Sequence, residues 1–257
     1  MTSSKIPVHY FNSVVNFGDL LNKWFIEKLF DVEVEWCSPE CQRRKQHLLA
    51  IGSILDFANS NSVVWGTGLL ETGALPKERP TYIAGLRGAL SAHALKNAGL
   101  LIPDALGDPG LVVSRLYGKQ VQKTYEVGVV PHYVDQKHPA VQDAARHSDT
   151  LVINVMRSPE LVCSQILSCA AIASSSLHGI MAADSFQVPN VWIKLTDQIE
   201  GGGFKFRDHF TVAQRLRHEP TELGTTFDRG IMLRCEIGEF HPETLELIIK
   251  SFPLDLF

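Results

Sequence analysis

A run of hydroxyl residues leads into a histidine at Ser174-Ser175-Ser176-Leu177-His178-Gly179. The run follows a strand-like segment and opens a helical pattern, so the hydroxyls of Ser175 and Ser176 and nearby backbone N–H groups favour an anion. His178 lies in the first turn, where the helix dipole lowers an imidazole pKa and a bound anion raises it. Two interpretations stay open: an anion site with a histidine donor or acid, and a serine-capped helix with a buried, hydrogen-bonded histidine.

Two other segments place cations near strand ends. Arg87 precedes a glycine at a strand-to-helix junction, where it can clamp a carboxylate or phosphate or form a surface ion pair. The segment Gly201-Gly202-Gly203-Phe204-Lys205-Phe206-Arg207 is a glycine-rich loop followed by two cations. Because Lys205 and Arg207 alternate with phenylalanines, both can face one cleft as a mobile lid over an anionic ligand. A solvated loop is the alternative.

The segment Asn16-Phe17-Gly18-Asp19 joins the first predicted strand to the first predicted helix. Asp19 can accept a proton from a sugar hydroxyl, or it can cap the helix. The basic run Arg43-Arg44-Lys45 forms an exposed face or contacts an anionic lipid head group.

Several common kinds of site are not supported. Cys37 and Cys41 supply two metal ligands where a structural zinc site needs four, so we expect no metal. The P-loop, G-x-S-x-G and H-E-x-x-H patterns are missing from the sequence. A Ser-His-Asp hydrolase is therefore poorly supported.

Composition narrows the protein class. The 257 residues are 45% apolar and 20% charged, with a formal net charge of −4. These values exclude disorder of the whole chain and speak against a nucleic-acid partner. An odd number of cysteines without a secretory signal favours a cytoplasmic protein. The longest apolar stretch, residues 161–186, contains His178 and Asp184, which argues against a membrane span.

Short apolar runs alternate with helical patterns, which predicts parallel sheets with right-handed crossovers. The predicted strands fall into two sets: 6–11, 48–51, 62–65 and 81–84, then 127–130, 150–155, 170–173 and 190–193. We therefore expect an α/β protein with two Rossmann-like domains, residues 1–120 and 121–257, that face one cleft. The second domain includes a terminal amphipathic helix over 243–251. Ligands bind beyond the carboxyl ends of such strands, where the segments described above lie.

Taken together, the segments resemble the polysaccharide pyruvyl transferase family, in its exopolysaccharide and succinoglycan-type ketal-forming members. The motifs, in chain order, are N-F-G-D at 16–19, G-S at 52–53, W-G-T-G at 65–68, L-R-G-A-L-S at 86–91, L-G-D-P-G-L at 106–111, G-V-V-P-H-Y-V-D at 128–135, S-S-L-H-G-I at 175–180, V-P at 188–189 and G-G-F-K-F-R-D at 202–208. The resemblance implies a GT-B-like fold, with the acceptor on the N-terminal domain and the donor on the C-terminal one.

The resemblance also implies a reaction. The donor is phosphoenolpyruvate, a substrate rather than a cofactor, and the acceptor is a pair of sugar hydroxyls on a lipid-linked oligosaccharide or polysaccharide. The product is a pyruvate ketal on an exopolysaccharide or other cell-surface repeat unit. Such an acceptor implies peripheral contact with the inner face of the membrane. Two alternatives stay open: a GT-B glycosyltransferase that uses a nucleotide sugar, and a non-catalytic component of polysaccharide assembly.

The resemblance assigns roles to residues. Arg87 and His178, with Leu177 alongside, serve the donor, and His178 acts as the acid or the phosphate hydrogen-bond donor. Ser176 stands where many family members have arginine, so helix-terminus amides, Arg87 and Lys205 or Arg207 must hold the phosphate. Asp19 is the candidate base. We expect Asn16, Gly66 and Thr67 to contact the acceptor.

Overall fold

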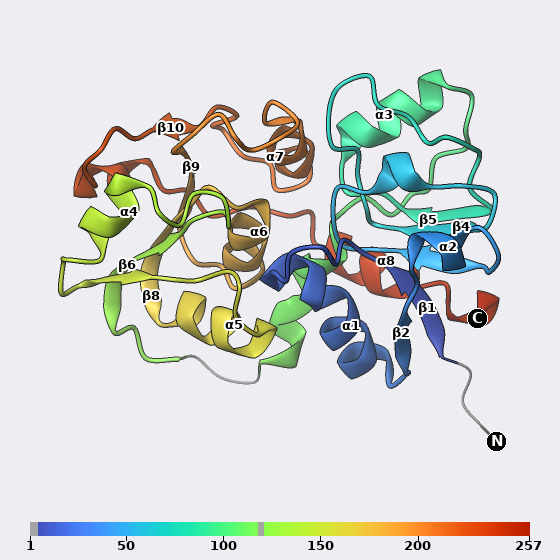
Figure 1. The fold of residues 1–257 in the computed structure, drawn as a ribbon, viewed down its shortest axis with the longest axis horizontal. Coiled ribbons are helices and arrows are strands. Elements are labelled where there is room, and N and C mark those ends of the chain that lie inside the picture. Colours follow the sequence, from blue (N-terminus) through green and yellow to red (C-terminus); the bar gives the residue numbers. More distant parts are fainter. Residues whose placement is uncertain (1–4, 118–120) are drawn as a thin grey trace.

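The computed structural model describes residues 5–117 and 121–257, which form two sheets side by side (Figure 1). The first sheet has the order β2-β1-β3-β4-β5, and its strands are β1 (Ile6–His9), β2 (Val34–Trp36), β3 (His47–Leu49), β4 (Ser62–Trp65) and β5 (Tyr82–Gly85). The second has the order β10-β9-β8-β6-β7, and its strands are β6 (Tyr125–Val130), β7 (Thr150–Val152), β8 (Cys169–Ser174), β9 (Asn190–Lys194) and β10 (Thr221–Glu222). The strand pairs within both sheets are parallel. The α/β prediction with two parallel sheets in a GT-B-like arrangement is confirmed.

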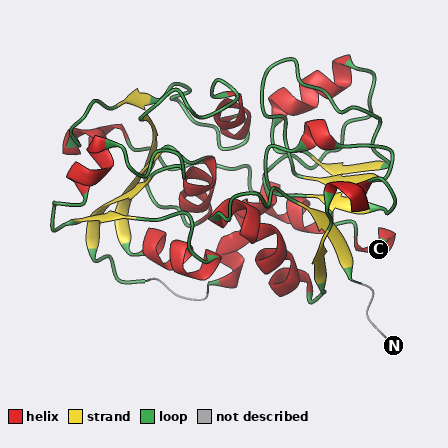
Figure 2. Ribbon diagram, in the orientation of Figure 1, coloured by secondary structure: helices red, strands yellow, loops and turns green. Residues whose placement is uncertain are grey.

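Helices connect the strands and cover the sheets (Figure 2). The α-helices are α1 (Phe17–Phe30), α2 (Pro39–Gln42), α3 (Ala89–Asn97), α4 (Pro139–Ala144), α5 (Pro159–Leu167), α6 (Leu177–Ser185), α7 (Phe204–Phe210) and α8 (Thr244–Lys250). The 3₁₀ helices are η1 (Leu55–Phe57), η2 (Pro109–Leu116), η3 (Arg229–Arg234) and η4 (Leu254–Leu256). Helices α2, α4 and α5 and η2 begin with proline, whose fixed φ suits the first helical position. Within the described ranges, no helix combines the length and apolar character needed to cross a membrane.

The strands form where apolar, largely β-branched runs can be buried on both faces. All four residues of β4 are buried, as are five of the six residues of β8, which is typical of parallel sheets covered by helices. Strands β2 and β10 have three and two residues. Each contains a glutamate, Glu35 in β2 and Glu222 in β10, so neither forms a continuous apolar run and the sequence pattern did not predict them.

One hydrophobic core extends through both halves of the molecule. It includes Trp65 from the first sheet, Val112 from η2 and Met181 from α6. Helix η2 packs on α6, where the Ser185 hydroxyl donates a hydrogen bond to the Leu111 carbonyl at 2.6 Å. Because the halves share a core, they are held in a fixed relation around the space between them.

The terminal helix α8 packs on the first half of the molecule, not on the second. The Trp65 indole Nε1 donates to the Ile248 carbonyl at 3.0 Å, and Phe252 stacks on Phe30 with 3.7 Å between ring centroids. The sequence analysis assigned this helix to the 121–257 domain because it follows the second strand set along the chain. Its amphipathic pattern shows that one face is buried but not which partner buries it. The predicted boundary after residue 120 borders residues 118–120, which lie outside the described residues.

Candidate active site

A cavity of about 410 Å³, here named the interdomain cavity, lies between the two halves and is lined by both. The first half contributes the segments that follow β1, β3 and β4, and the second half contributes those that follow β6, β7, β8 and β9. Six residues predicted from the sequence meet here: Asn16, Asp19, Ser176, Leu177, His178 and Lys205. The cavity therefore lies at the carboxyl ends of parallel strands, as ligand sites in such sheets do.

Two helix N-termini converge on this cavity, one from each half. Asn16 caps α1, with its side chain accepting from the Asp19 backbone N–H at 3.2 Å. Ser176 is the N-cap of α6, but its side chain makes no capping hydrogen bond. Across the described residues, the backbone N–H groups of Leu177 and His178 have no hydrogen-bond partner. The positive ends of two helix dipoles therefore face the same small space.

His178 extends from α6 toward the start of α1. A methyl group on Gly18 would overlap the imidazole ring, so the ring lies directly against the α1 backbone. The Nε2 atom is buried and has no hydrogen-bond partner among the residues that the structure describes. Burial, followed by the charges of Lys205 and Arg87, lowers the pKa of His178 to about 3. The imidazole is therefore neutral at pH 7 in the free protein.

A carboxyl and an ammonium group that both titrate near neutrality line the same cavity. Burial raises the pKa of Asp19 to about 7, although the hydrogen bond from Asn16 and the charge of Lys205 oppose the rise. Burial and the charge of Arg87 lower the pKa of Lys205 to about 8. Within the described part of the chain, Lys205 forms no hydrogen bond or ion pair, and its ammonium group lies 6.0 Å from the centre of the Phe206 ring. It is thus a cation available to a ligand.

Arg87 lies behind the cavity wall rather than in it. The side chain is fully buried, and it donates to Ser53 Oγ and the Leu69 carbonyl at 2.6 Å each, and to Asp208 Oδ2 at 3.0 Å. Ser53 lines the cavity, so Arg87 positions one of its walls and adds positive potential to it. The prediction that Arg87 clamps the donor directly stays a prediction.

Arg207 faces away from the interdomain cavity. It pairs with Glu219 through two hydrogen bonds of 2.8 and 3.1 Å and lies over the Trp192 ring. The interpretation that Lys205 and Arg207 face one cleft was wrong, because residues 204–210 form helix α7. Positions two apart on a helix point in different directions. The residues are also not a loose lid, since Asp208 of α7 bonds to Arg87 and Ser91.

Three other predicted residues shape the surroundings of the cavity without lining it. The Ser175 hydroxyl donates to Asp135 Oδ2 at 2.7 Å. Thr67 Oγ1 donates to the Gly52 carbonyl at 2.9 Å and accepts from the Ile54 backbone N–H at 3.2 Å. Gly66 has a φ of 87° and lies where a side chain would overlap Pro109. The predicted contact of Gly66 and Thr67 with an acceptor stays a prediction.

The cavity also contains residues that the sequence analysis did not assign. They are Ser53, His132, Tyr133, Gln198 and Glu200. Ser53 and His132 follow strands β3 and β6, and the sequence predicts both at strand ends where a ligand binds, but without a specific role. Burial and the charge of Lys205 lower the pKa of His132 to about 4. Gln198 and Glu200 precede the glycine-rich segment and had no comparable signal.

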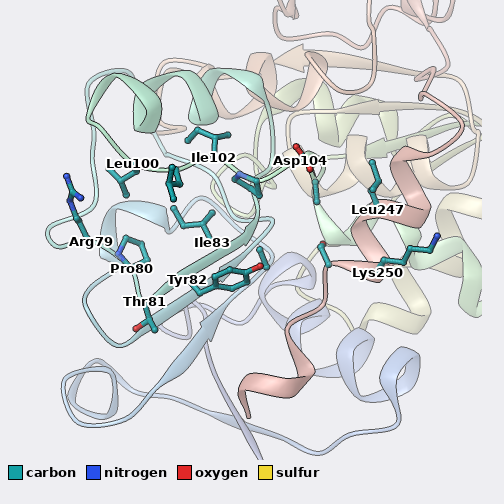
Figure 3. A pocket seen from close by; sticks show the side chains of 15 residues that line it. Arg79, Pro80, Thr81, Tyr82, Ile83, Leu100, Ile102, Asp104, Leu247 and Lys250 are labelled. Atoms are coloured by element: carbon teal, nitrogen blue, oxygen red, sulfur yellow. The ribbon is translucent and has the colours of Figure 1, made fainter.

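A larger hollow of about 660 Å³ lies elsewhere, along strand β5 and helix α8 (Figure 3). Arg79, Tyr82, Leu100, Asp104 and Lys250 are among its lining residues. It contains none of the predicted site residues. The chemistry of the lining, and not its size, therefore identifies the interdomain cavity as the candidate active site.

The fold and the cavity define an α/β protein of GT-B-like architecture, with a polar cavity between its halves that Lys205 and two helix N-termini line. The family model for polysaccharide pyruvyl transferases matches residues 16–196, and the chain belongs to this family. The matched range includes strands β2 to β9 and the N-termini of α1 and α6, whereas β1 and α7 lie outside it.

The chain is similar to two curated proteins. The chain is 32% identical over 215 residues to "Uncharacterized protein L143" of Acanthamoeba polyphaga mimivirus, covering 81% of this chain and 74% of the relative. It is 28% identical over 213 residues to "Succinoglycan biosynthesis protein ExoV" of Rhizobium meliloti (strain 1021), covering 79% of this chain and 63% of that relative. The chain thus spans less than two thirds of the length of the second protein.

Proposed function

We propose that this protein transfers a pyruvyl group from phosphoenolpyruvate to two hydroxyls of a sugar, which forms a pyruvate ketal during exopolysaccharide biosynthesis. The observation that carries the proposal is the unpartnered Nε2 of His178 in a cavity where two helix N-termini meet an unpaired Lys205. Membership of the polysaccharide pyruvyl transferase family supports it.

Binding of phosphoenolpyruvate requires several hydrogen-bond donors and cations on the protein, because this substrate carries a phosphate and a carboxylate. Three groups without a partner among the described residues can receive them: the backbone N–H groups of Leu177 and His178 and the Lys205 ammonium. Ser176 stands where many family members have arginine. In this chain Lys205 supplies a positive charge in place of that arginine. Arg87 adds positive potential from behind the cavity wall, where it donates a hydrogen bond to Ser53.

The proposed reaction conserves atoms and charge. A proton adds to the methylene carbon of phosphoenolpyruvate, and the first sugar hydroxyl bonds to the neighbouring carbon as it loses its proton. The bond from that carbon to the phosphate oxygen then breaks, and the second hydroxyl closes the ketal. Of the two hydroxyl protons, one balances the proton in the new methyl group and the other leaves with inorganic phosphate.

His178 and Asp19 divide the proton transfers. The negative charges of the bound donor raise the pKa of His178 from its low value in the free protein, so donor binding creates the acid that protonates the methylene carbon. Asp19, with a pKa of about 7, is a suitable base for the first hydroxyl at neutral pH. Lys205 and the helix termini stabilise the phosphate as it leaves.

The test is incubation with phosphoenolpyruvate and a broad panel of synthetic and lipid-linked glycosides. Phosphate release must depend on the acceptor, and the acceptor must gain the mass of a ketal-linked pyruvate. The His178→Ala variant should lose turnover while keeping the thermal stability of the wild type. Activity of that variant equal to wild type would remove His178 from the mechanism.

Ligand-binding measurements, compared with the phosphate-release assay, separate the two alternatives. Thermal stabilisation by nucleotide sugars and not by phosphoenolpyruvate would indicate a glycosyltransferase. Binding of an oligosaccharide without phosphate release from any acceptor would indicate a non-catalytic assembly component.

A further inference from the structure

A second cavity of about 610 Å³, here named the aromatic groove, lies at the carboxyl ends of β1 and β2. Its lining includes Phe11, Trp36, Gln42, Arg43, Phe57 and Lys77. Phe11, Ile54 and Phe57 line both this groove and the interdomain cavity. The two spaces are therefore neighbours that share one wall, so a chain-like ligand can occupy both.

The groove presents aromatic rings to solvent. Phe11, Trp36 and Phe57 are 43%, 42% and 47% exposed, and exposed apolar side chains gathered in one concave place indicate a binding surface. The Trp36 indole N–H donates to the Tyr10 carbonyl at 3.1 Å, which fixes the ring. Flat, preorganised rings of this kind suit the C–H faces of sugar rings, because stacking on them costs little side-chain entropy.

Polar groups of the groove complement a hydroxyl-rich ligand. Gln42 is only 6% exposed, and its Nε2 has no hydrogen-bond partner among the described residues. A buried amide without a partner is uncommon and calls for an acceptor atom. Lys77 lies over the Phe57 ring at 6.0 Å, and Arg43 is exposed at the rim. A lipid chain would leave these polar groups unsatisfied, whereas sugar hydroxyls and ring oxygens would pair with them.

We propose that the aromatic groove is a subsite that binds the sugars of the acceptor chain adjacent to the one that receives the pyruvyl group. This inference rests on the proposed function, which puts the reacting sugar in the interdomain cavity. The next sugars of the chain then extend past the shared wall into the aromatic groove. Trp36 and Gln42 are then specificity residues that lie outside the reacting centre.

The first part of the experiment measures binding without turnover. Wild-type protein, Trp36→Ala, Gln42→Ala and the conservative Trp36→Phe are applied to a printed array of glycans one to several sugars long, and the tightest binder is then titrated by calorimetry. Tyr82→Ala is the matched control, because Tyr82 is 52% exposed but lies on β5, away from the groove. We expect wild type and Tyr82→Ala to favour longer chains, about tenfold weaker binding by Trp36→Ala, and recovery in Trp36→Phe.

The second part measures phosphate release from phosphoenolpyruvate with that glycan and with its terminal monosaccharide as a methyl glycoside. For Trp36→Ala we expect the KM for the oligosaccharide to rise about tenfold, with kcat and the KM for phosphoenolpyruvate unchanged. The monosaccharide should react equally with both proteins.

The outcomes separate the two proposals. Glycan binding that fails for the wild type, or that is unchanged in both Trp36→Ala and Gln42→Ala, overturns the groove even if ketal forms. Groove-dependent glycan binding without phosphate release overturns the proposed reaction but keeps the groove as a glycan site.

Discussion

The Arg87 guanidinium and the Asp208 carboxylate form an ion pair with 2.9 Å between Nη2 and Oδ2, and both side chains are fully buried. Arg87 follows β5 in the first half, and Asp208 belongs to α7 of the second. Asp208 also accepts hydrogen bonds from the Ser91 backbone N–H at 2.9 Å and the Ser91 hydroxyl at 2.6 Å, at the start of α3. The pair joins the two halves behind the interdomain cavity, and it holds the helix that carries Lys205.

Replacing Asp208 with alanine should strongly destabilise the protein. The change leaves the Arg87 charge buried without a counter-ion, which costs about 3–5 kcal/mol. Urea unfolding measures the loss. The matched control is Glu219→Gln on the exposed Arg207–Glu219 pair, where we expect about 1 kcal/mol or less. Equal losses in the two variants would contradict a stabilising role for the buried pair.

Replacing Gly18 with alanine should reduce activity by displacing the His178 ring. A methyl group at Gly18 would overlap the imidazole, while alanine itself is favourable in a helix. Displacement of a catalytic group by about 1 Å can cost about 100-fold in rate, so we expect a loss of that order in kcat. The control is Gly224→Ala, because a side chain there meets nothing within 4 Å. Unchanged kcat in Gly18→Ala would show that the position of the ring is unimportant.

Replacing Asp19 with asparagine should stabilise the protein at alkaline pH and abolish turnover. Between its ordinary value of 3.8 and its raised pKa of about 7, Asp19 is protonated in the native state and ionised in the unfolded state. The native state therefore binds more protons, and the wild-type free energy of unfolding falls as pH rises through this window. Asparagine cannot ionise, so the variant avoids this fall.

The pH dependence provides the internal control for that variant. The stability advantage of Asp19→Asn should be of order 4 kcal/mol at pH 8, from a rise of about 3 pKa units at about 1.4 kcal/mol each, and should fall to about 1 kcal/mol near pH 4.5. Urea unfolding at both values measures it. An advantage that does not change with pH would show that Asp19 has an ordinary pKa.

Replacing Lys205 with glutamine should weaken donor binding. The variant loses a cation that has no other partner in the described residues, and charged hydrogen bonds contribute about 1.5–3 kcal/mol. We therefore expect the KM for phosphoenolpyruvate to rise about 10-fold to 100-fold. Arg207→Gln is the control from the same helix, because Arg207 is engaged by Glu219 outside the cavity. A larger effect from Arg207→Gln would reverse the roles assigned to the two cations.

The site residues that were predicted best from the sequence are those whose positions are set by the ends of strands. Asn16 and Asp19 lie at the start of the helix that follows β1, and His178 lies at the start of the helix that follows β8. Parallel strands bring their carboxyl ends, and the helix starts that follow them, to one edge. Arg87 also follows a strand, but its partner Asp208 is 121 residues away. A pairing over that distance leaves no local pattern, so its burial could not be predicted.

Other features depend on packing partners that no periodicity encodes. The alternation of Lys205 and Arg207 with phenylalanines is the pattern of a strand, yet Gly203 at φ 82° starts a helix there. The aromatic face around Phe206 is then buried by Trp192, with 4.3 Å between ring centroids. The return of α8 to the first sheet is likewise a tertiary contact, through Trp65 and Ile248.

The most direct test of the central claim follows the donor carbon into the product. Phosphoenolpyruvate labelled with carbon-13 at its central carbon is incubated in deuterated water with a glycan that supports phosphate release, and the product is examined by NMR. We expect a quaternary ketal carbon bonded to two sugar oxygens, next to a methyl group that carries one deuterium, and no such product from His178→Ala. A retained methylene group, or label found only in free pyruvate, would contradict that claim.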